Sequence, residues 1–398
     1  MSGILQNIKS IFISLANICS ILFRGWNIRK VISFSNLLKL LFIYLVSIVI
    51  TILVEFDTSE GFWSKAIQQR FSDKRMAFYS VRERIGESLL YDRVMKVAKD
   101  HGYDYASLRV TESLSHFWLT EHFYYVSASV LNYLLNPKFN LALTHHVNII
   151  PYGYNISYLN MPLDSLYSPG GKFLKRWRHL NDYDAYADLY SFVYGENTIL
   201  KNLIGSKKII PVYLAQYKTD YHELPINKAL ITGTLWGCNR GSLRFRLALK
   251  RLAEEDLLVA IGTSDFAYMG KNYLGRAETF GKAIAAMDEQ QQKFGIALII
   301  HNMEHMLDGI PTSRIAEAAS NGALIIADQN KFLLKFFGDN VLYFNAFGTD
   351  LEIYEQIKAH IKWAKENPEL AKVKAKKSYE IFQNMTIEKQ LEGIFQLL

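Results

Sequence analysis

The stretch DGIPTSRIAEAASNGALIIAD, residues 308–328, contains the clearest signals for the fold. Its Pro-Thr-Ser at 311–313 can begin and cap a helix, and the alanines that follow permit close packing. Asn321-Gly322 is a stop signal for that helix. The uncharged run 323–327 then predicts a buried strand. The stretch therefore predicts a helix that leads into a buried strand, as in parallel α/β sheets.

Similar apolar runs alternate with helical segments on both sides of a polar linker at 217–228. Before the linker, strands are predicted at 75–81, 106–110, 139–143, 155–160, 189–193 and 208–213. After it, strands are predicted at 229–232, 257–261, 296–300, 323–327 and 341–344. The pattern predicts an α/β chain of two Rossmann-like, doubly wound domains at 70–220 and 229–380, with a C-terminal helix at 381–398.

Open parallel sheets bind ligands at the carboxyl ends of their strands, so two such sheets that face each other enclose a cleft. The helix predicted from about residue 312 has amides in its first turn and the positive end of its dipole, which bind anions without a metal. Arg314 and Glu317 lie in its first turns. A carboxylate one turn inside the helix can accept hydrogen bonds from a vicinal diol. The segment is therefore a candidate site for a ligand that carries both an anion and a diol.

This segment resembles the group 1, family 4-like glycosyltransferases of the GT-B fold, whose signature reads like P-S-x-R-x-x-E-A-x-A-x-G-x-x-x-x-x-D. The matching residues are Pro311, Ser313 (displaced by one position, after Thr312), Arg314, Glu317, Ala318, Gly322 and Asp328. The resemblance covers 229–380 well and 75–215 only in strand order. It implies that Glu317 holds the ribose of a nucleotide sugar. The alternative is an ordinary amphipathic helix with a surface salt bridge.

One position departs from the family's pattern. Many retaining members have an acidic residue eight positions before the glutamate. Here that position is Gly309, and Asp308 lies one residue further back. The sequence therefore leaves open whether transfer retains or inverts the anomeric configuration.

A second segment, ITGTLWGCNRGSLRFRLALK at 231–250, places a loop and a basic helix after a predicted strand. The resemblance implies that Gly233 and Thr234 lie near the donor and that a basic side chain binds its diphosphate. Arg240 and Arg244 are the candidates, because a guanidinium pairs bidentately with phosphate. The leaving nucleoside diphosphate gains charge that such a group must stabilise.

Two further loops are expected at the cleft. Gly262 and Thr263 follow a predicted strand and either approach the nucleotide base or form a plain turn. The residues from His301 to His305 match the H-x-x-E-H zinc pattern formally. That chemistry needs both histidines on one helix face, whereas His301 directly ends a predicted strand. We therefore expect no metal site, and we expect the loop from Asn302 to border the donor sugar.

A general base is expected from the first domain, because inverting GT-B enzymes deprotonate the acceptor hydroxyl there. His145 and His146 follow the predicted strand at 139–143, and histidine titrates near neutral pH. A polar loop role is the alternative for this pair. Arg84 and Gly86, after the first predicted strand, are further candidates for lining the cleft.

The first 54 residues differ from the rest of the chain. They contain five Lys or Arg and no Asp or Glu, and they include uncharged apolar runs at 11–23 and 40–54. We expect a membrane-associated leader. A single span would send the rest of the chain across the membrane, because the positive-inside rule puts Arg24, Arg29 and Lys30 in the cytoplasm. A segment lying in the inner leaflet, which we favour, keeps the catalytic domains on the cytoplasmic side. A buried helix pair is the alternative. The remaining residues carry 40 basic against 38 acidic side chains, a balance that does not indicate a nucleic-acid partner.

The composition, 50% hydrophobic with two distant cysteines, excludes a disordered chain and a disulfide framework. The resemblance implies a metal-independent and cofactor-independent glycosyltransferase. The expected donor is a nucleotide sugar, and the expected acceptor is a glycan or lipid-linked molecule, as in cell-envelope polysaccharide or lipopolysaccharide biosynthesis at a membrane surface. The alternative is a catalytically inactive GT-B-like membrane scaffold or regulatory subunit.

Overall fold

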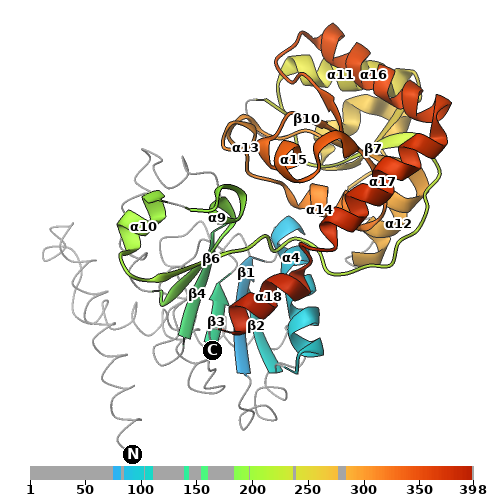
Figure 1. Cartoon of the computed structure of the whole chain (residues 1–398). Helices are drawn as coiled ribbons and strands as arrows, with labels where there is room; N and C mark the ends of the chain where they lie inside the picture. The colour runs from blue at the N-terminus through green and yellow to red at the C-terminus, as the bar shows by residue number, and fades with distance from the viewer. Residues whose placement is uncertain are drawn as a thin grey trace, which may run out of the picture.

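The computed structural model describes residues 75–81, 85–102, 104–110, 139–142, 154–159, 183–196, 198–235, 239–276 and 284–396. Two parallel sheets, one in each half of the chain, form the two bodies seen in Figure 1. The predicted leader at 1–54 lies outside the described residues. Among the residues that are described, no helix is long and apolar enough to cross a membrane.

The sheet of the N-terminal half has six parallel strands in the order β2-β1-β3-β4-β5-β6. The strands are β1 (Arg75–Val81), β2 (Asp104–Val110), β3 (Phe139–Ala142), β4 (Tyr154–Leu159), β5 (Ala185–Asp188) and β6 (Lys208–Pro211). Helix α4 (Ile85–Asp100) connects β1 to β2, and helices α9 (Leu189–Tyr194) and α10 (Thr198–Ile204) lie between β5 and β6 in the chain.

The prediction of a strand at 189–193 is wrong, because these residues belong to helix α9. The carboxylate of Asp188 accepts hydrogen bonds from the backbone N–H of Ser191 at 2.9 Å and from its hydroxyl at 2.5 Å. This N-cap starts a helix directly after β5. Leu189 and Val193, four residues apart, are both buried. The apolar run is therefore the buried side of a short helix.

The sheet of the C-terminal half has five parallel strands in the order β11-β10-β9-β7-β8. The strands are β7 (Lys228–Gly233), β8 (Leu258–Gly262), β9 (Gly295–Ile299), β10 (Leu324–Asp328) and β11 (Leu342–Phe344). All five agree with the predicted strands to within one residue at each end. The α-helices of this half are α11 (Leu243–Glu254), α12 (Ile284–Phe294), α13 (Met303–Leu307), α14 (Ser313–Ser320), α15 (Lys331–Phe336), α16 (Asp350–Glu366) and α17 (Pro368–Phe382), and the 3₁₀ segments are η2 (Ser264–Asn272) and η4 (Gly338–Asn340).

Both faces of the C-terminal sheet are buried. Alternate residues of a strand point to opposite faces, and β9 shows this clearly. Its Ile296 and Leu298 belong to a core that contains the apolar sides of α11 and α16. Its Ala297 and Ile299 belong to a second core, formed with α14 and α15. Burial on both faces explains why the strand sequences are continuous apolar runs rather than alternating ones.

The chain connects the two halves twice. Residues 212–227, which form no helix or strand, lead from β6 to β7. After α17, helix α18 (Ile387–Phe395) returns to the N-terminal half and lies beside α4 (Figure 1). There Leu391 and Ile394 pack in one cluster with Leu90 and Val94 of α4. The last helix therefore holds the two halves together.

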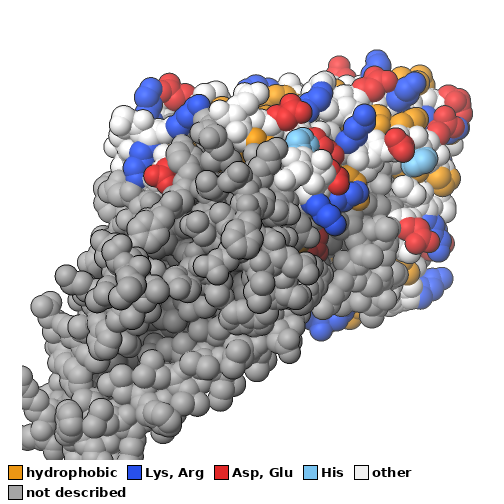
Figure 2. Space-filling view, turned by 90° about the horizontal axis from the view of Figure 1, so that it is seen from below, with side chains coloured by type: hydrophobic (Ala, Val, Ile, Leu, Met, Phe, Trp, Pro, Cys, Tyr) orange, Lys and Arg blue, Asp and Glu red, His pale blue; other side chains and the backbone are white. Residues whose placement is uncertain are grey.

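The described surface carries both signs of charge. Figure 2 shows Lys and Arg side chains interspersed with Asp and Glu over the coloured part of the face that it presents. This agrees with the nearly neutral balance of the chain after residue 54.

Candidate functional site

Three strands of the C-terminal sheet end where polar and charged side chains gather. Thr234 follows β7, His301 follows β9, and Asp328 ends β10. Because β9 lies between β7 and β10 in the sheet, these positions are neighbours. Ligands of open parallel sheets bind at this edge, which makes it the candidate functional site.

Two arginines contribute the positive charge at this edge. Arg314, in the first turn of α14, donates from Nη1 to the backbone oxygen of Thr232 at 2.9 Å. Arg240 is 5% exposed, and its Nη2 lies 3.5 Å from Thr234 Oγ1. Burial, and after it the charge of Arg314, lowers the pKa of Arg240 to about 8, and burial also lowers the pKa of Arg314. Two guanidinium groups at one edge of the sheet can together bind an anion with more than one negative charge.

His305, on the short helix α13, belongs to the same cluster. Burial, followed by the proximity of His301, Arg314 and Arg240, lowers the pKa of His305 to about 3. The His305 imidazole is therefore neutral near pH 7. The positive charge facing a ligand anion then comes from the arginines.

His301 and Asp328 form a buried pair, each 0% exposed. His301 Nδ1 lies 2.7 Å from Asp328 Oδ1, and the backbone N–H of His301 donates to Oδ2 at 2.7 Å. The carboxylate favours a proton on Nδ1 of His301. Nε2 is buried and has no hydrogen-bond partner among the described residues. The pair fixes the end of β9 to the end of β10.

Arg244 supports the loop that carries Arg240. Its Nη2 donates to Asn239 Oδ1 at 2.7 Å, and its Nη1 donates to the backbone oxygen of Gly348 at 3.4 Å. Asn239 is buried and donates from Nδ2 to the backbone oxygen of His301 at 3.3 Å. Of the two arginines predicted for a diphosphate, Arg240 thus lies beside Arg314, whereas Arg244 is engaged with the loop.

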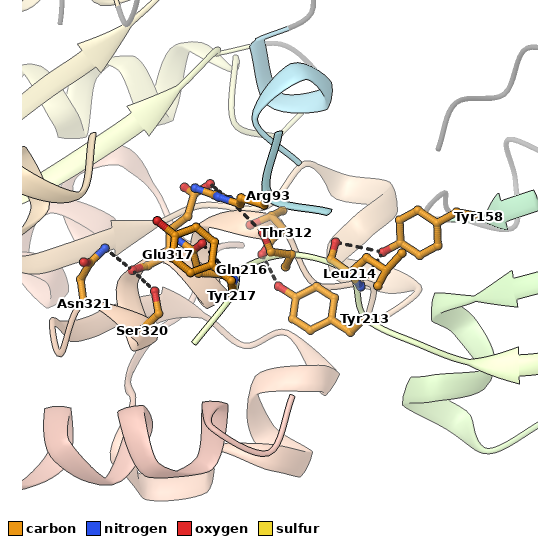
Figure 3. Close-up of polar contacts among 11 residues, drawn as sticks. Arg93, Tyr158, Tyr213, Leu214, Gln216, Tyr217, Thr312, Glu317, Ser320 and Asn321 are labelled. Atoms are coloured by element: carbon orange, nitrogen blue, oxygen red, sulfur yellow. Dashed lines mark hydrogen bonds and ion pairs between the residues drawn. The ribbon is translucent and has the colours of Figure 1, made fainter. Parts of the chain in front are cut away.

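Glu317 lies one turn after Arg314 on α14, at the contact between the two halves (Figure 3). Its Oε1 is 3.0 Å from Nη1 of Arg93, which belongs to α4 of the N-terminal half. The same Nη1 donates to the backbone oxygen of Ala215 at 2.8 Å. The Arg93 side chain is 1% exposed, and that of Glu317 is 22% exposed. The residue predicted to hold ribose therefore pairs with an arginine of the other half and stays partly accessible.

A small cavity of about 20 Å³ adjoins Arg314 and Glu317. Thr232, Gln291 and Asn321 provide the rest of its polar lining, and residues of β7 and β9 provide the apolar part. A cavity of this size holds about one water. It therefore provides room for a water beside the carboxylate and is too small for a ligand.

The N-terminal half also contacts the start of α14. Thr312 is the N-cap residue, and its backbone oxygen accepts a hydrogen bond from Tyr213 Oη at 2.7 Å. Burial raises the pKa of Tyr213 well above its usual range, so Tyr213 is a neutral donor. Thr312 Oγ1 is buried and makes no hydrogen bond within the described part of the chain. Pro311 is buried, and Ser313 is partly buried.

Three residues predicted near the donor have local structural roles. A Cβ at Gly262 would lie 1.9 Å from the backbone oxygen of Gly233, so the ends of β7 and β8 leave no room for a side chain. Thr263 donates its N–H to the Gly233 oxygen at 3.1 Å and its hydroxyl to Asp265 Oδ2 at 2.8 Å. Asn302 caps α13, because its Oδ1 accepts from the His305 N–H at 2.8 Å. Gly262 and Thr263 therefore form a tight turn at the sheet edge.

The departure at Gly309 has a steric cause. Gly309 has φ of +65°, and a Cβ there would lie 2.4 Å from Tyr194 Oη and 2.8 Å from the Cβ of Lys331. Tyr194, from α9 of the N-terminal half, donates to the backbone oxygen of Asp308 at 2.5 Å. The backbone conformation and the neighbouring side chains thus both exclude an acidic residue at this position.

Several residues that the sequence analysis predicted for the site are not described by the structure or belong to other elements. His145, His146 and Arg84 lie outside the described residues, and Gly86 is part of helix α4. Within the described ranges, no group of three His, Cys, Asp or Glu side chains is arranged to hold a metal ion. His301 precedes the N-cap of α13, so His301 and His305 do not share the helix that the zinc pattern needs.

Sequence reasoning missed the His301–Asp328 pair and Arg93. His301 follows one predicted strand and Asp328 lies at the end of another. The pair could have been predicted only by assuming that these two strands are neighbours in the sheet. Arg93 precedes Glu317 by 224 residues, and no local pattern indicates their pairing.

No protein-family model and no curated protein matches this chain. Solved structures do match it. Sucrose-phosphate synthase from Thermosynechococcus elongatus is 10% identical with a TM-score of 0.54, covering 81% of this chain and 98% of its own. HepE from Anabaena, in complex with UDP and glucose, is 13% identical with a TM-score of 0.54, covering 81% and 99%. A glycosyltransferase from Rickettsia africae is 11% identical with a TM-score of 0.50, covering 82% and 98%.

At these identities the likeness shows the fold. The chain is an α/β protein with two parallel sheets, and it has the GT-B fold of glycosyltransferases.

Proposed function

We propose that this protein is a glycosyltransferase that moves a sugar from a nucleotide-sugar donor to an acceptor hydroxyl. The observation that carries the proposal is the pairing of Arg240 and Arg314 beside the first turn of α14, at the carboxyl edge of the C-terminal sheet. The GT-B fold supports it, as does the presence of UDP and glucose in the structure of HepE. The same edge in this chain is the proposed donor site.

The proposed reaction breaks the bond between the anomeric carbon of the sugar and a diphosphate oxygen. The departing nucleoside diphosphate gains negative charge, which Arg240 and Arg314 stabilise through charge-assisted hydrogen bonds. The amides of the first turn of α14 add to this stabilisation. We propose that these groups suffice without a metal ion.

The remaining donor contacts are proposed from position. Glu317 accepts hydrogen bonds from the ribose, while Gly233 and Thr234 border the donor after β7. Asn302, in the loop after His301, borders the transferred sugar. The base lies toward the turn at Gly262 and Thr263.

The acceptor side remains as predicted from the sequence. We propose a glycan or lipid-linked acceptor in cell-envelope polysaccharide or lipopolysaccharide-type biosynthesis, with His145 or His146 as the general base. The leader at 1–54 is proposed to associate with a membrane whose cytoplasmic side carries the catalytic halves.

A thermal-shift experiment on the full chain with UDP, GDP, ADP, CDP and dTDP tests the donor site. We expect one nucleotide to raise the melting temperature by a few degrees, because a ligand that binds only the folded state stabilises it. Arg240→Gln is expected to lower the affinity for that nucleotide roughly tenfold or more, since it removes a charge-assisted contact to phosphate. The matched control is Arg251→Gln on the same loop-helix segment, because Arg251 pairs with Asp350 at 3.0 Å on the surface.

Release of free nucleoside diphosphate from the matching nucleotide sugar then separates turnover from binding. Release that depends on Arg240 supports an enzyme. Binding without release supports the inactive scaffold instead. If none of the five nucleotides shifts the melting curve, the donor-site proposal is wrong.

A further inference from the structure

Arg93 is a buried cation whose only hydrogen-bonded side chain, among the described residues, is Glu317. The Nη1 group of Arg93 contacts Glu317 Oε1 at 3.0 Å and the backbone oxygen of Ala215 at 2.8 Å. The Nε and Nη2 groups of Arg93 are buried and have no partner within the described ranges. The packing of α4 therefore leaves Arg93 with one charged partner, and that partner lies on α14 of the other half (Figure 3).

The contact orients Glu317 without occupying it fully. Arg93 is only 1% exposed, and the backbone of Ala215 fixes the position of its Nη1. It holds Oε1 of Glu317, whereas Oε2 makes no hydrogen bond to the described residues. The Glu317 side chain is 22% exposed. One carboxylate oxygen thus stays available next to Arg314.

We infer that Arg93 is a positioning residue for the donor ribose: it holds Glu317 so that Oε2 accepts the hydrogen bonds of the ribose hydroxyls. This inference rests on the proposed function, and it adds a residue of the N-terminal half to a donor site that otherwise belongs to the C-terminal half. The ribose site is then complete only while α4 is docked against α14.

Charge gives a second reason for this role. A carboxylate at the ribose lies close to the diphosphate of the same ligand, and two negative groups in a partly buried site repel each other. The guanidinium of Arg93, whose Nη1 lies 3.0 Å from Glu317 Oε1, offsets this repulsion.

The test compares ribose and deoxyribose binding by calorimetry of the full chain. UDP, GDP and ADP are titrated, and the one that binds most tightly is compared with its 2′-deoxy counterpart. We expect the wild type to prefer the ribonucleotide roughly tenfold, the effect of one hydrogen bond to a charged group. Glu317→Gln and Arg93→Gln should each reduce this preference to below about threefold, and Arg93→Lys should retain part of it.

Tyr194→Phe is the matched control, because it removes another hydrogen bond between the halves, at Asp308, without touching Glu317. It should keep the wild-type preference, so a loss in Arg93→Gln reports on ribose binding and not on loosened docking. If Arg93→Gln does not fold, Arg93→Met and Arg93→Lys replace it. We expect Arg93→Met to reduce the preference to below about threefold and Arg93→Lys to retain part of it.

Three results would overturn the inference while leaving nucleotide binding, and hence the proposed function, intact. In the first, the Arg93 variants keep the full ribose preference while Glu317→Gln loses it. In the second, Arg93→Gln binds the ribonucleotide more tightly than the wild type, which makes Arg93 a competitor of ribose; in the third, the wild type shows no preference for ribose. If none of the three nucleotides binds, the proposed function fails, and the inference fails with it.

Discussion

The two halves of the protein bring different kinds of side chain to the region of the candidate site. The C-terminal half brings charged groups, with Arg240 and Arg314 at the edge of its sheet and Glu317 on α14. The described part of the N-terminal half contributes aromatic and aliphatic side chains to the contact. Phe192 of α9 stacks on Phe336 of α15 with ring centroids 5.5 Å apart.

This difference separates binding chemistry from support. The groups that we propose to bind a diphosphate, Arg240 and Arg314, lie in one half. The other half supplies apolar contact area and one buried counter-charge, Arg93. The contact between Arg93 and Glu317 is therefore where the two kinds of surface depend on each other.

The largest expected effect comes from breaking that contact on the charged side. Glu317→Ala leaves the Arg93 guanidinium buried without a carboxylate, which should lower the free energy of unfolding by about 3 kcal/mol. This value is at the lower end of the range for breaking a buried ion pair, because Glu317 is partly exposed. Urea denaturation measures this loss. Replacing both residues, with Arg93→Met and Glu317→Leu, should recover at least half of it. Losses that simply add in the double variant would contradict this account.

The next effect tests the charged edge itself. In Asp328→Asn, the amide can serve only one of the two His301 donors that now share the carboxylate. The unsatisfied buried group should cost about 2 kcal/mol of unfolding free energy. The exposed Asp339→Asn is the control, with an expected change below about 0.5 kcal/mol. An Asp328 variant as stable as this control would show that the pair does not hold β9 to β10.

A smaller effect tests the aromatic side of the contact. Gly309→Asp places an acid where many retaining relatives have one, but it meets a positive φ and Tyr194. The positive φ alone should cost about 1 kcal/mol, and the contact with Tyr194 should add to this loss. Gly205→Asp is the control, since Gly205 has a similar φ of +66° and nothing within 4 Å of an added Cβ. If both variants lose the same stability, the contact with Tyr194 does not exclude the acid.

The smallest effect concerns His305. Its pKa is lowered to about 3 in the folded protein, below the ordinary value of about 6.5. The imidazole should therefore stay neutral from pH 8 to pH 5 in NMR spectra of the folded chain, whereas an exposed histidine titrates. Because the unfolded chain binds this proton and the folded chain does not, His305 should lower stability as pH falls from about 6.5 toward 3. A His305 signal that titrates near pH 6.5 would contradict the burial of this group.

The fold of the C-terminal half was largely predictable because its strands are buried on both faces. Such strands are short, continuous apolar runs between turn signals, and all five were located to within one residue at each end. The segment at 189–193 was misread because an apolar run of that length fits a strand or the buried side of a short helix. The Asp188 cap, three residues before Ser191, was the local signal that distinguishes the two.

Residues of the candidate site could be proposed from the sequence where they belong to local motifs. Arg240, Arg314 and Glu317 were candidates because each lies just after a strand or in the first turns of a helix. The buried partner of Glu317 was not predictable, because Arg93 reaches it only through the docking of the two halves. The partner of His301 depends on which strands are neighbours in the sheet, and strand order is not contained in a local motif.

The most direct test of the donor site is a crystal structure of the full chain with the nucleoside diphosphate that stabilises it most. We predict that phosphate oxygens lie within hydrogen-bond distance of Arg240 and Arg314, beside the first turn of α14, and that the ribose faces Glu317. A nucleotide bound elsewhere, with Arg240 and Arg314 not contacting phosphate, would contradict the account.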